Sequence, residues 1–169
     1  TTYTYYPTAE TDVYARWTAN THTVTLDQES GVAGYNTPGT DTEKTATYNE
    51  DMPTVGGTMP IAATGYKFAG YYTGHNGTGT KYYNADGTSA HKWDIDENTT
   101  LYAYFEKAQI TNIVFSPTTA AGETRVVATP TISPTPEGTT YICWKLFNNA
   151  ECTHETEGYT FSNAAGDAI

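Results

Sequence analysis

The sequence predicts a mainly β protein built from small modules in tandem. Thr is the commonest of the 169 residues, and the chain also contains 15 Tyr and 15 Gly. Thr and Tyr favour strands and Gly favours turns, whereas the strong helix formers Leu, Glu, Lys and Arg are scarce. Only 37% of the residues are hydrophobic, but 14% are aromatic. Bulky aromatic side chains in a chain of low apolar content favour several small cores over a single large one.

An internal repeat divides the chain. Val13-Tyr14-Ala15-Arg16-Trp17 recurs 88 residues later as Leu101-Tyr102-Ala103-Tyr104-Phe105. A repeat at a fixed offset is the pattern of tandem modules, in which each copy is one folded unit. We therefore predict that residues 1–17 are the closing strands of a preceding repeat, that 18–106 form a complete copy, and that 107–169 form a different domain.

Within 18–106, apolar and polar residues alternate with the period of a half-buried strand. Turns are expected at 74–77 and 84–87, where Gly tolerates a positive φ, and residues 27–44 are expected to form a loop. One face of each strand is predicted to be buried. The expected core contains Val24, Leu26, Phe68, Trp93, Ile95, Leu101, Ala103 and Phe105.

From residue 107 the pattern changes to short strands separated by turns. Strands are predicted at 110–115, 125–129, 141–147 and 159–162, and this spacing is typical of a β-sandwich. Cys143 and Cys152 lie in this part of the chain. Their spacing across a predicted turn leaves three alternatives open: a disulfide bond between them, two free thiols, or a partner beyond Ile169.

Residues 64–105, TGYKFAGYYTGHNGTGTKYYNADGTSAHKWDIDENTTLYAYF, resemble the Listeria–Bacteroides repeat, also called the internalin B-repeat. THTVTLDQ at 21–28 and TATYNEDMP at 45–53 fit the opening strands of that family. The resemblance implies a β-grasp-like module, strung in tandem on secreted or cell-wall-associated bacterial proteins as a spacer or binding stalk. It brings no catalytic residues. Residues 107–169 more loosely resemble a bacterial immunoglobulin-like domain, with Trp144 as its core Trp and with its final strands missing.

Charge excludes several classes of partner. The net charge is −11 and the chain has no basic stripe, so nucleic acids would be repelled. No segment approaches the roughly 20 apolar residues that a membrane-spanning helix needs, and membrane insertion is not expected.

Motifs for catalysis, cofactors and metals are absent or incomplete, so no enzyme activity, cofactor or metal is expected. The segment 74–81 has its Lys one residue too late for a phosphate-binding loop, and a hairpin loop fits better. Asp94, Asp96 and Glu97 offer oxygen ligands, but the Gly and closing Glu of a calcium loop are missing. A solvated strand edge is therefore the favoured interpretation. The four His residues lack the spacing of a zinc site.

A cluster of tyrosines supplies the candidate binding residues Tyr71, Tyr82, Tyr102 and Tyr104. A tyrosine combines a flat apolar face with a polar rim, which suits a sugar ring or a protein hot spot. We expect a non-catalytic spacer and adhesion module of an extracellular or cell-surface bacterial protein. Its expected partners are neighbouring repeats and an unknown protein or glycan. The alternative is a carbohydrate-binding accessory module of a secreted glycan-degrading enzyme.

Overall fold

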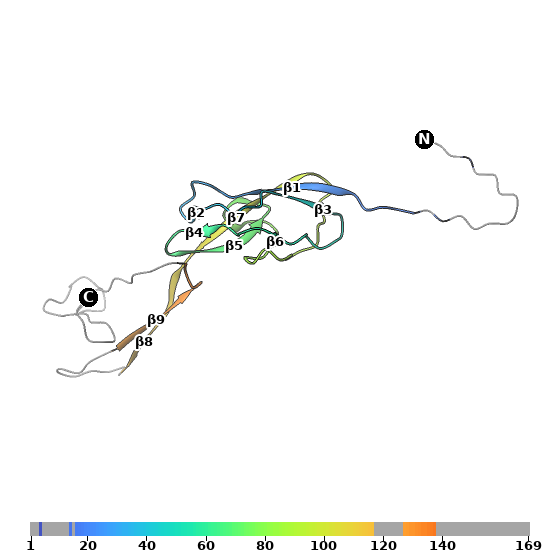
Figure 1. Cartoon of the computed structure of the whole chain (residues 1–169). Coiled ribbons are helices and arrows are strands. Elements are labelled where there is room, and N and C mark those ends of the chain that lie inside the picture. Colours follow the sequence, from blue (N-terminus) through green and yellow to red (C-terminus); the bar gives the residue numbers. More distant parts are fainter. Residues whose placement is uncertain (1–3, 5–13, 15, 117–126, 138–169) are drawn as a thin grey trace, which may run out of the picture. The chain divides into compact units, whose positions relative to one another are not determined.

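The structure, a computed structural model, describes residues 4, 14, 16–116 and 127–137. The chain divides into two compact units, 1–138 and 139–169, and every described residue belongs to the first. The fold is mainly β, and in the described part only one short 3-10 turn is helical. The elements are β1 (Thr21–Asp27), β2 (Tyr35–Thr37), β3 (Glu43–Thr47), β4 (Ile61–Ala62), β5 (Tyr66–Tyr72), η1 (His75–Gly77), β6 (Lys81–Tyr83), β7 (Thr99–Lys107), β8 (Gln109–Ser116) and β9 (Val127–Ser133) (Figure 1).

A mixed five-stranded sheet forms the body of the module, with its strands in the order β3-β1-β7-β5-β6. The central strand, β7, is parallel to its neighbour β1, and the other neighbouring strands are antiparallel. In chain order, β1 is the first strand of this sheet and β7 is the last. Because they run in the same direction, the chain enters the sheet at one end and leaves it at the other (Figure 1).

The predicted core is confirmed at seven of its eight positions. Leu101, Ala103 and Phe105 of β7 are buried, and Tyr102 and Tyr104 between them are half-buried on the opposite face. Ile95 is only partly buried, although it packs against the core. Met52, Val55, Ala62, Tyr71, Tyr82 and Tyr83 belong to the same cluster. The segment between β3 and β5 therefore contributes to the core as well as the strands.

A β-bulge in β5 inverts the register that simple alternation predicts. The pairing of β5 with β7 shifts between Phe68 and Gly70. Gly70 has φ 124°, and a Cβ atom there would lie 2.1 Å from the carbonyl oxygen of Tyr83. Such a bulge adds one residue to a strand and so reverses the faces of the residues that follow. Tyr71 consequently points into the core and Tyr72 points outward.

The observed loops and short strands agree in part with those predicted from the sequence. The turn at 74–77 is η1, and the turn at 84–87 ends at Gly87 with φ 80°. The prediction that 27–44 is all loop was wrong, because β2 and the start of β3 lie there. β2 pairs with β4 in a small separate ladder. At residues 92–95 the alternation of apolar and polar side chains predicts a strand, but the structure has there one bridge, between Asp51 and Lys92.

Beyond the five-stranded sheet, β8 and β9 form an antiparallel hairpin. β8 confirms the predicted strand at 110–115. β9 runs through Pro130 to Ser133, past the predicted end at 129, because a two-stranded ribbon has free edges on which Pro is tolerated. After the hairpin, the backbone N–H of Glu137 donates to the Tyr66 carbonyl at 2.9 Å. The strands predicted at 141–147 and 159–162, both Cys residues and Trp144 lie outside the described residues, as do most of residues 1–17.

Candidate functional site

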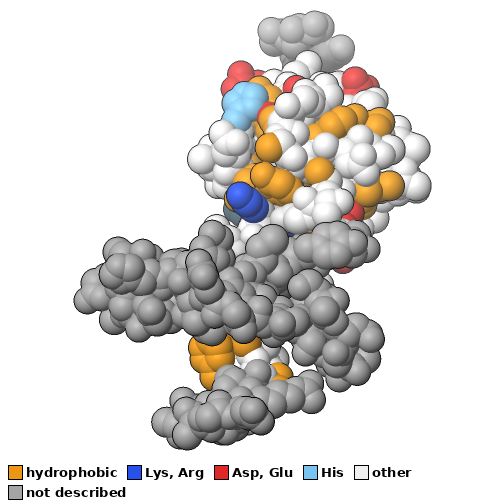
Figure 2. All heavy atoms as spheres, turned by 90° about the vertical axis from the view of Figure 1, so that its left-hand side faces the viewer, with side chains coloured by type: hydrophobic (Ala, Val, Ile, Leu, Met, Phe, Trp, Pro, Cys, Tyr) orange, Lys and Arg blue, Asp and Glu red, His pale blue; other side chains and the backbone are white. Residues whose placement is uncertain are grey.

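Three half-buried tyrosines form the outer face of the sheet and are defined here as the aromatic face: Tyr72, Tyr102 and Tyr104. Tyr72 pairs directly with Tyr102 across β5 and β7, and Tyr104 lies two residues further along β7, opposite Gly70. The rings of Tyr72 and Tyr104 meet edge to face, with centroids 5.8 Å apart and planes at 89°. Figure 2 shows hydrophobic side chains reaching the surface of the module between polar ones.

The turn η1 packs on the aromatic face and holds it in place. The His75 ring lies over Tyr102, with centroids 4.0 Å apart and planes at 36°. His75 Nδ1 is also hydrogen-bonded to a carboxylate oxygen of Glu29, which lies in the loop after β1. On the other side, Lys81 Nζ lies 5.7 Å from the Tyr72 ring centroid, within the range of a cation–π contact. The aromatic rings are therefore fixed from both sides.

Gly77 is required where η1 approaches Tyr104. Its φ is 72°, and a Cβ atom there would lie 2.6 Å from Tyr104 Cδ1. We expect Gly77→Ala to lower the free energy of unfolding by about 1–3 kcal/mol more than Gly65→Ala does. Gly65 is the matched control because its φ is also positive, at 83°, but no atom lies within 4 Å of a Cβ atom built there. Urea denaturation of both variants measures the difference, and equal losses would show that the contact with Tyr104 contributes nothing.

Beside the aromatic face lies a cleft of about 230 Å³. It forms where β1 ends at Asp27 while β7 continues, so that the loop after β1 passes the open edge of β7. Its lining combines aromatic, amide and carboxylate groups. These come from Glu29, Val32, Ala33, Gly34, Tyr66, Asn76, Ala103, Tyr104 and Phe105. Tyr104 thus belongs to both the aromatic face and the cleft.

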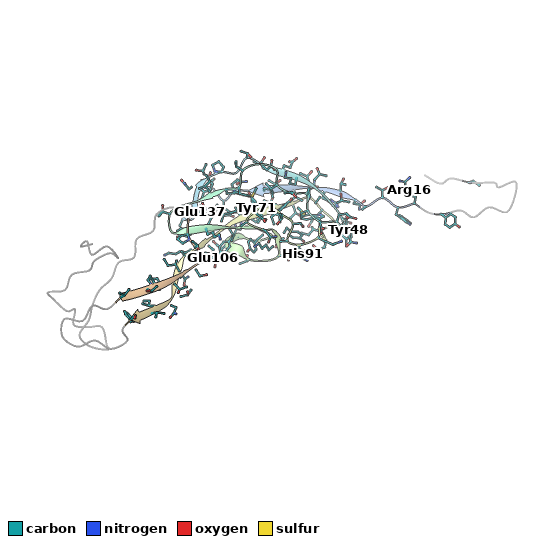
Figure 3. The ribbon with its side chains drawn as sticks, turned by 60° about the horizontal axis from the view of Figure 1, so that its bottom comes forward. Arg16, Tyr48, Tyr71, His91, Glu106 and Glu137 are labelled. Atoms are coloured by element: carbon teal, nitrogen blue, oxygen red, sulfur yellow. The ribbon has the colours of Figure 1, made fainter. Side chains whose placement is uncertain are left out.

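Two of the four predicted binding residues are buried in the structure. Tyr71 and Tyr82 are each 1% exposed and belong to the core. Tyr71 was displaced by the bulge at Gly70, and it lies within the module in Figure 3. Tyr82 is covered by Trp93, with ring centroids 5.0 Å apart, and its hydroxyl donates to Asp94. Burial raises the pKa of Tyr71 to about 12.

Tyr102 and Tyr104 lie on the outer face, as predicted. The structure adds Tyr72, His75 and Asn76, which the sequence interpretation did not select. The Asn-Gly pair at 76–77 marked a turn, but nothing in the local pattern showed that the turn folds back onto Tyr102 and Tyr104.

Asp94 and Asp96 are both exposed, as the alternation around Trp93 predicts. Asp94 accepts a hydrogen bond from Tyr82, whereas Asp96 accepts from Asn20 Nδ2 at 3.0 Å and from His22 Nε2 at 2.9 Å. These two hydrogen bonds lower the pKa of the Asp96 carboxyl. The carboxylates therefore serve different partners, and no group of three metal-ligating side chains occurs among the described residues.

Comparisons with known proteins assign no family. No protein-family model matches the chain, and no curated protein or solved structure matches it. Within the described ranges, no helix is long and apolar enough to cross a membrane.

Proposed function

We propose that residues 18–106 are a non-catalytic spacer and adhesion module of a secreted or cell-surface bacterial protein, of the Listeria–Bacteroides repeat type. The observation that carries the spacer function is the parallel pairing of β1 and β7, the first and last strands of the sheet in chain order. This pairing places entry and exit at opposite ends of the module, so each copy in a tandem array lengthens the chain of modules. The same mixed sheet is compatible with the β-grasp-like architecture that the resemblance implies.

The segment that leads into the module is short and attached to it. Only residues 18–20 separate Trp17, the end of the predicted preceding repeat, from the first residue of β1. The Asn20 carbonyl accepts a hydrogen bond from the Tyr48 N–H at 2.9 Å, and its side chain donates to Asp96. In Figure 3, Arg16 lies on the segment that leads toward β1. A short, anchored connection favours a stiff array over a freely jointed one.

The spacer function predicts that length grows with copy number. We expect proteins carrying one, two and three in-register copies of residues 18–106 ahead of the native C-terminal part to increase in maximum dimension by a constant step per copy. Small-angle X-ray scattering measures this dimension. A matched set with a Gly/Ser-rich linker of ten residues between copies would show smaller and less regular steps. Copies that pack side by side, with no increase in length, would refute the spacer function.

A carbohydrate-binding accessory module is the second candidate, and the cleft at Tyr104 favours it. Sugar sites combine an aromatic face with hydrogen-bonding groups at its rim. Here Asn76, Tyr104 and Tyr66 line the cleft, and within the described part of the chain the Asn76 carboxamide and the two tyrosine hydroxyls make no hydrogen bond. With a net charge of −11, the chain would repel sulfated and uronic-acid glycans. Neutral glycans are therefore the expected class.

For this second candidate we expect the 169-residue chain to bind neutral oligosaccharides on a glycan array, with weak affinity because the cleft is small. Tyr104→Ala should abolish the signal, and Asn76→Gly should reduce it while keeping the left-handed backbone at this position, where φ is 56°. Tyr48→Ala is the control, since Tyr48 is 42% exposed and does not line the cleft. Absence of binding, or binding that survives Tyr104→Ala, would reject the cleft as a sugar site.

A further inference from the structure

We infer that the β1–β7 ladder is a mechanical clamp that keeps the module folded under tension, an inference that rests on the proposed spacer function. A module in a surface array transmits force from the neighbour before it to the neighbour after it. The force therefore enters at the start of β1 and leaves at the end of β7. How the module responds depends on how these two strands are paired.

The pairing places the ladder in shear. Val24 lies opposite Thr99 and Asp27 lies opposite Tyr102, in a parallel register. Tension draws β1 toward its N-terminal end and β7 toward its C-terminal end, which are opposite directions along two parallel strands. The hydrogen bonds of the ladder are then loaded together. In a hairpin pulled from its open end, by contrast, the bonds break one after another.

Neither load-bearing strand is an edge strand. β1 lies between β3 and β7, and β7 lies between β1 and β5. On the buried face, Leu26 is opposite Leu101, and the two side chains are 2% and 0% exposed. Sliding β1 along β7 would expose both side chains to water as well as break the ladder, and the loss of buried apolar area adds to the barrier.

Side chains reinforce the ladder at the entry end. The Asn98 carboxamide oxygen accepts a hydrogen bond from the Thr23 backbone N–H at 2.9 Å. Asp96 accepts from Asn20 and His22 in the same region. Both acceptors lie just before β7, and all three donors lie at the start of β1 or immediately before it. They therefore join the two loaded strands beside the ladder, and they share its load.

At its exit end, β7 stays paired with β5 up to its last residue. Lys107, its last residue, pairs with Tyr66 of β5, and the next residue, Ala108, donates to the Gly65 carbonyl at 2.9 Å. Because β7 stays paired with β5 to its end, tension reaches the β1–β7 ladder without first peeling β7 from the sheet.

Single-molecule force spectroscopy on the full chain between handle proteins tests the clamp. We expect terminal pulling to give one main unfolding event that releases the 87 residues from Thr21 to Lys107, or about 30 nm of contour length. In a second geometry, one handle is attached at the N-terminus and the other through Tyr48→Cys, with both native Cys residues replaced by Ser. This geometry opens β1 from β3 starting at the Thr21–Thr47 pair. It should require a several-fold lower force.

Two matched variants separate mechanical from thermodynamic stability. Asn98→Ala removes a carboxamide acceptor within the load path. Asp86→Ala removes an acceptor for the Thr88 N–H, at 3.0 Å, outside that path. We expect both to lower the free energy of unfolding in urea, but only Asn98→Ala to lower the unfolding force, because forced unfolding follows the unfolding barrier along the pulling direction.

Equal forces in the two pulling geometries, or equal effects of the two variants on force, would overturn the clamp. The spacer function is judged separately by the length of the arrays. Extended arrays with forces that do not depend on geometry would retain the spacer and reject the clamp. Strong, geometry-dependent forces in compact arrays would support the clamp within a module and reject the spacer.

Discussion

Leu101→Ala is expected to lower the free energy of unfolding by about 2–5 kcal/mol. Leu101 is fully buried at the centre of the sheet, opposite Leu26 on β1. Removing its side chain loses apolar contacts and leaves a cavity, because the two neighbouring strands prevent the core from closing around it. Chemical denaturation of the 169-residue chain, followed by Trp fluorescence and by far-UV circular dichroism, measures the loss.

The neighbouring substitution Thr100→Ala is the control for this experiment. Thr100 is half-buried on the opposite face of β7, and its loss should cost less than about 1 kcal/mol, the span of strand propensities. A larger loss for Thr100→Ala than for Leu101→Ala would mean that the register of β7 is shifted by one residue, since such a shift exchanges the two faces of a strand.

Alkaline pH is expected to unfold the module through three buried tyrosines. Tyr71, Tyr82 and Tyr83 are each at most 1% exposed. Burial raises the pKa of the Tyr71 phenol from 10.0 to about 12, and it also raises the pKa values of Tyr82 and Tyr83. The folded state therefore retains protons that the unfolded chain releases near pH 10.

The direction of the effect follows from this difference. Below pH 10 both states hold the protons and stability is unchanged, whereas above pH 10 the unfolded state is favoured increasingly. Each of the three phenols contributes up to about 1.4 kcal/mol per pH unit, so their combined effect is large. Absorbance at 295 nm and far-UV circular dichroism should show these tyrosines ionising only as the sheet unfolds. Reversible ionisation of every tyrosine near pH 10, with an intact dichroism spectrum, would contradict their burial.

Local alternation was sufficient wherever a strand is regular. Leu101, Ala103 and Phe105 were assigned to the core from a period of two, and the structure buries all three. The turns at 74–77 and 84–87 were found from their Gly residues because few other residues adopt a positive φ. Both signals depend only on residues close together in the chain, and they survive folding unchanged.

The candidate site was less predictable because its residues come together from separate segments. A period of two counted from Phe68 would place Tyr71 on the outer face, but the bulge at Gly70 turns Tyr71 into the core and Tyr72 to the outer face. Alternation says nothing of how Trp93 covers Tyr82, or how η1 returns to the aromatic face. Each of these depends on a contact between distant parts of the chain.

The sequence by itself determined a mainly β protein, the repeated strand pattern, most of the core and the net negative charge. Only the tertiary structure decided which tyrosines face outward and in which direction the chain crosses the module. The pairing that sets this direction joins residues 24–27 to residues 99–102. Periodicity specifies the face of a strand on which a side chain lies. It carries no information about which strand pairs with which, or whether the pair is parallel. Strand pairing and strand direction depend on packing between segments far apart in the chain.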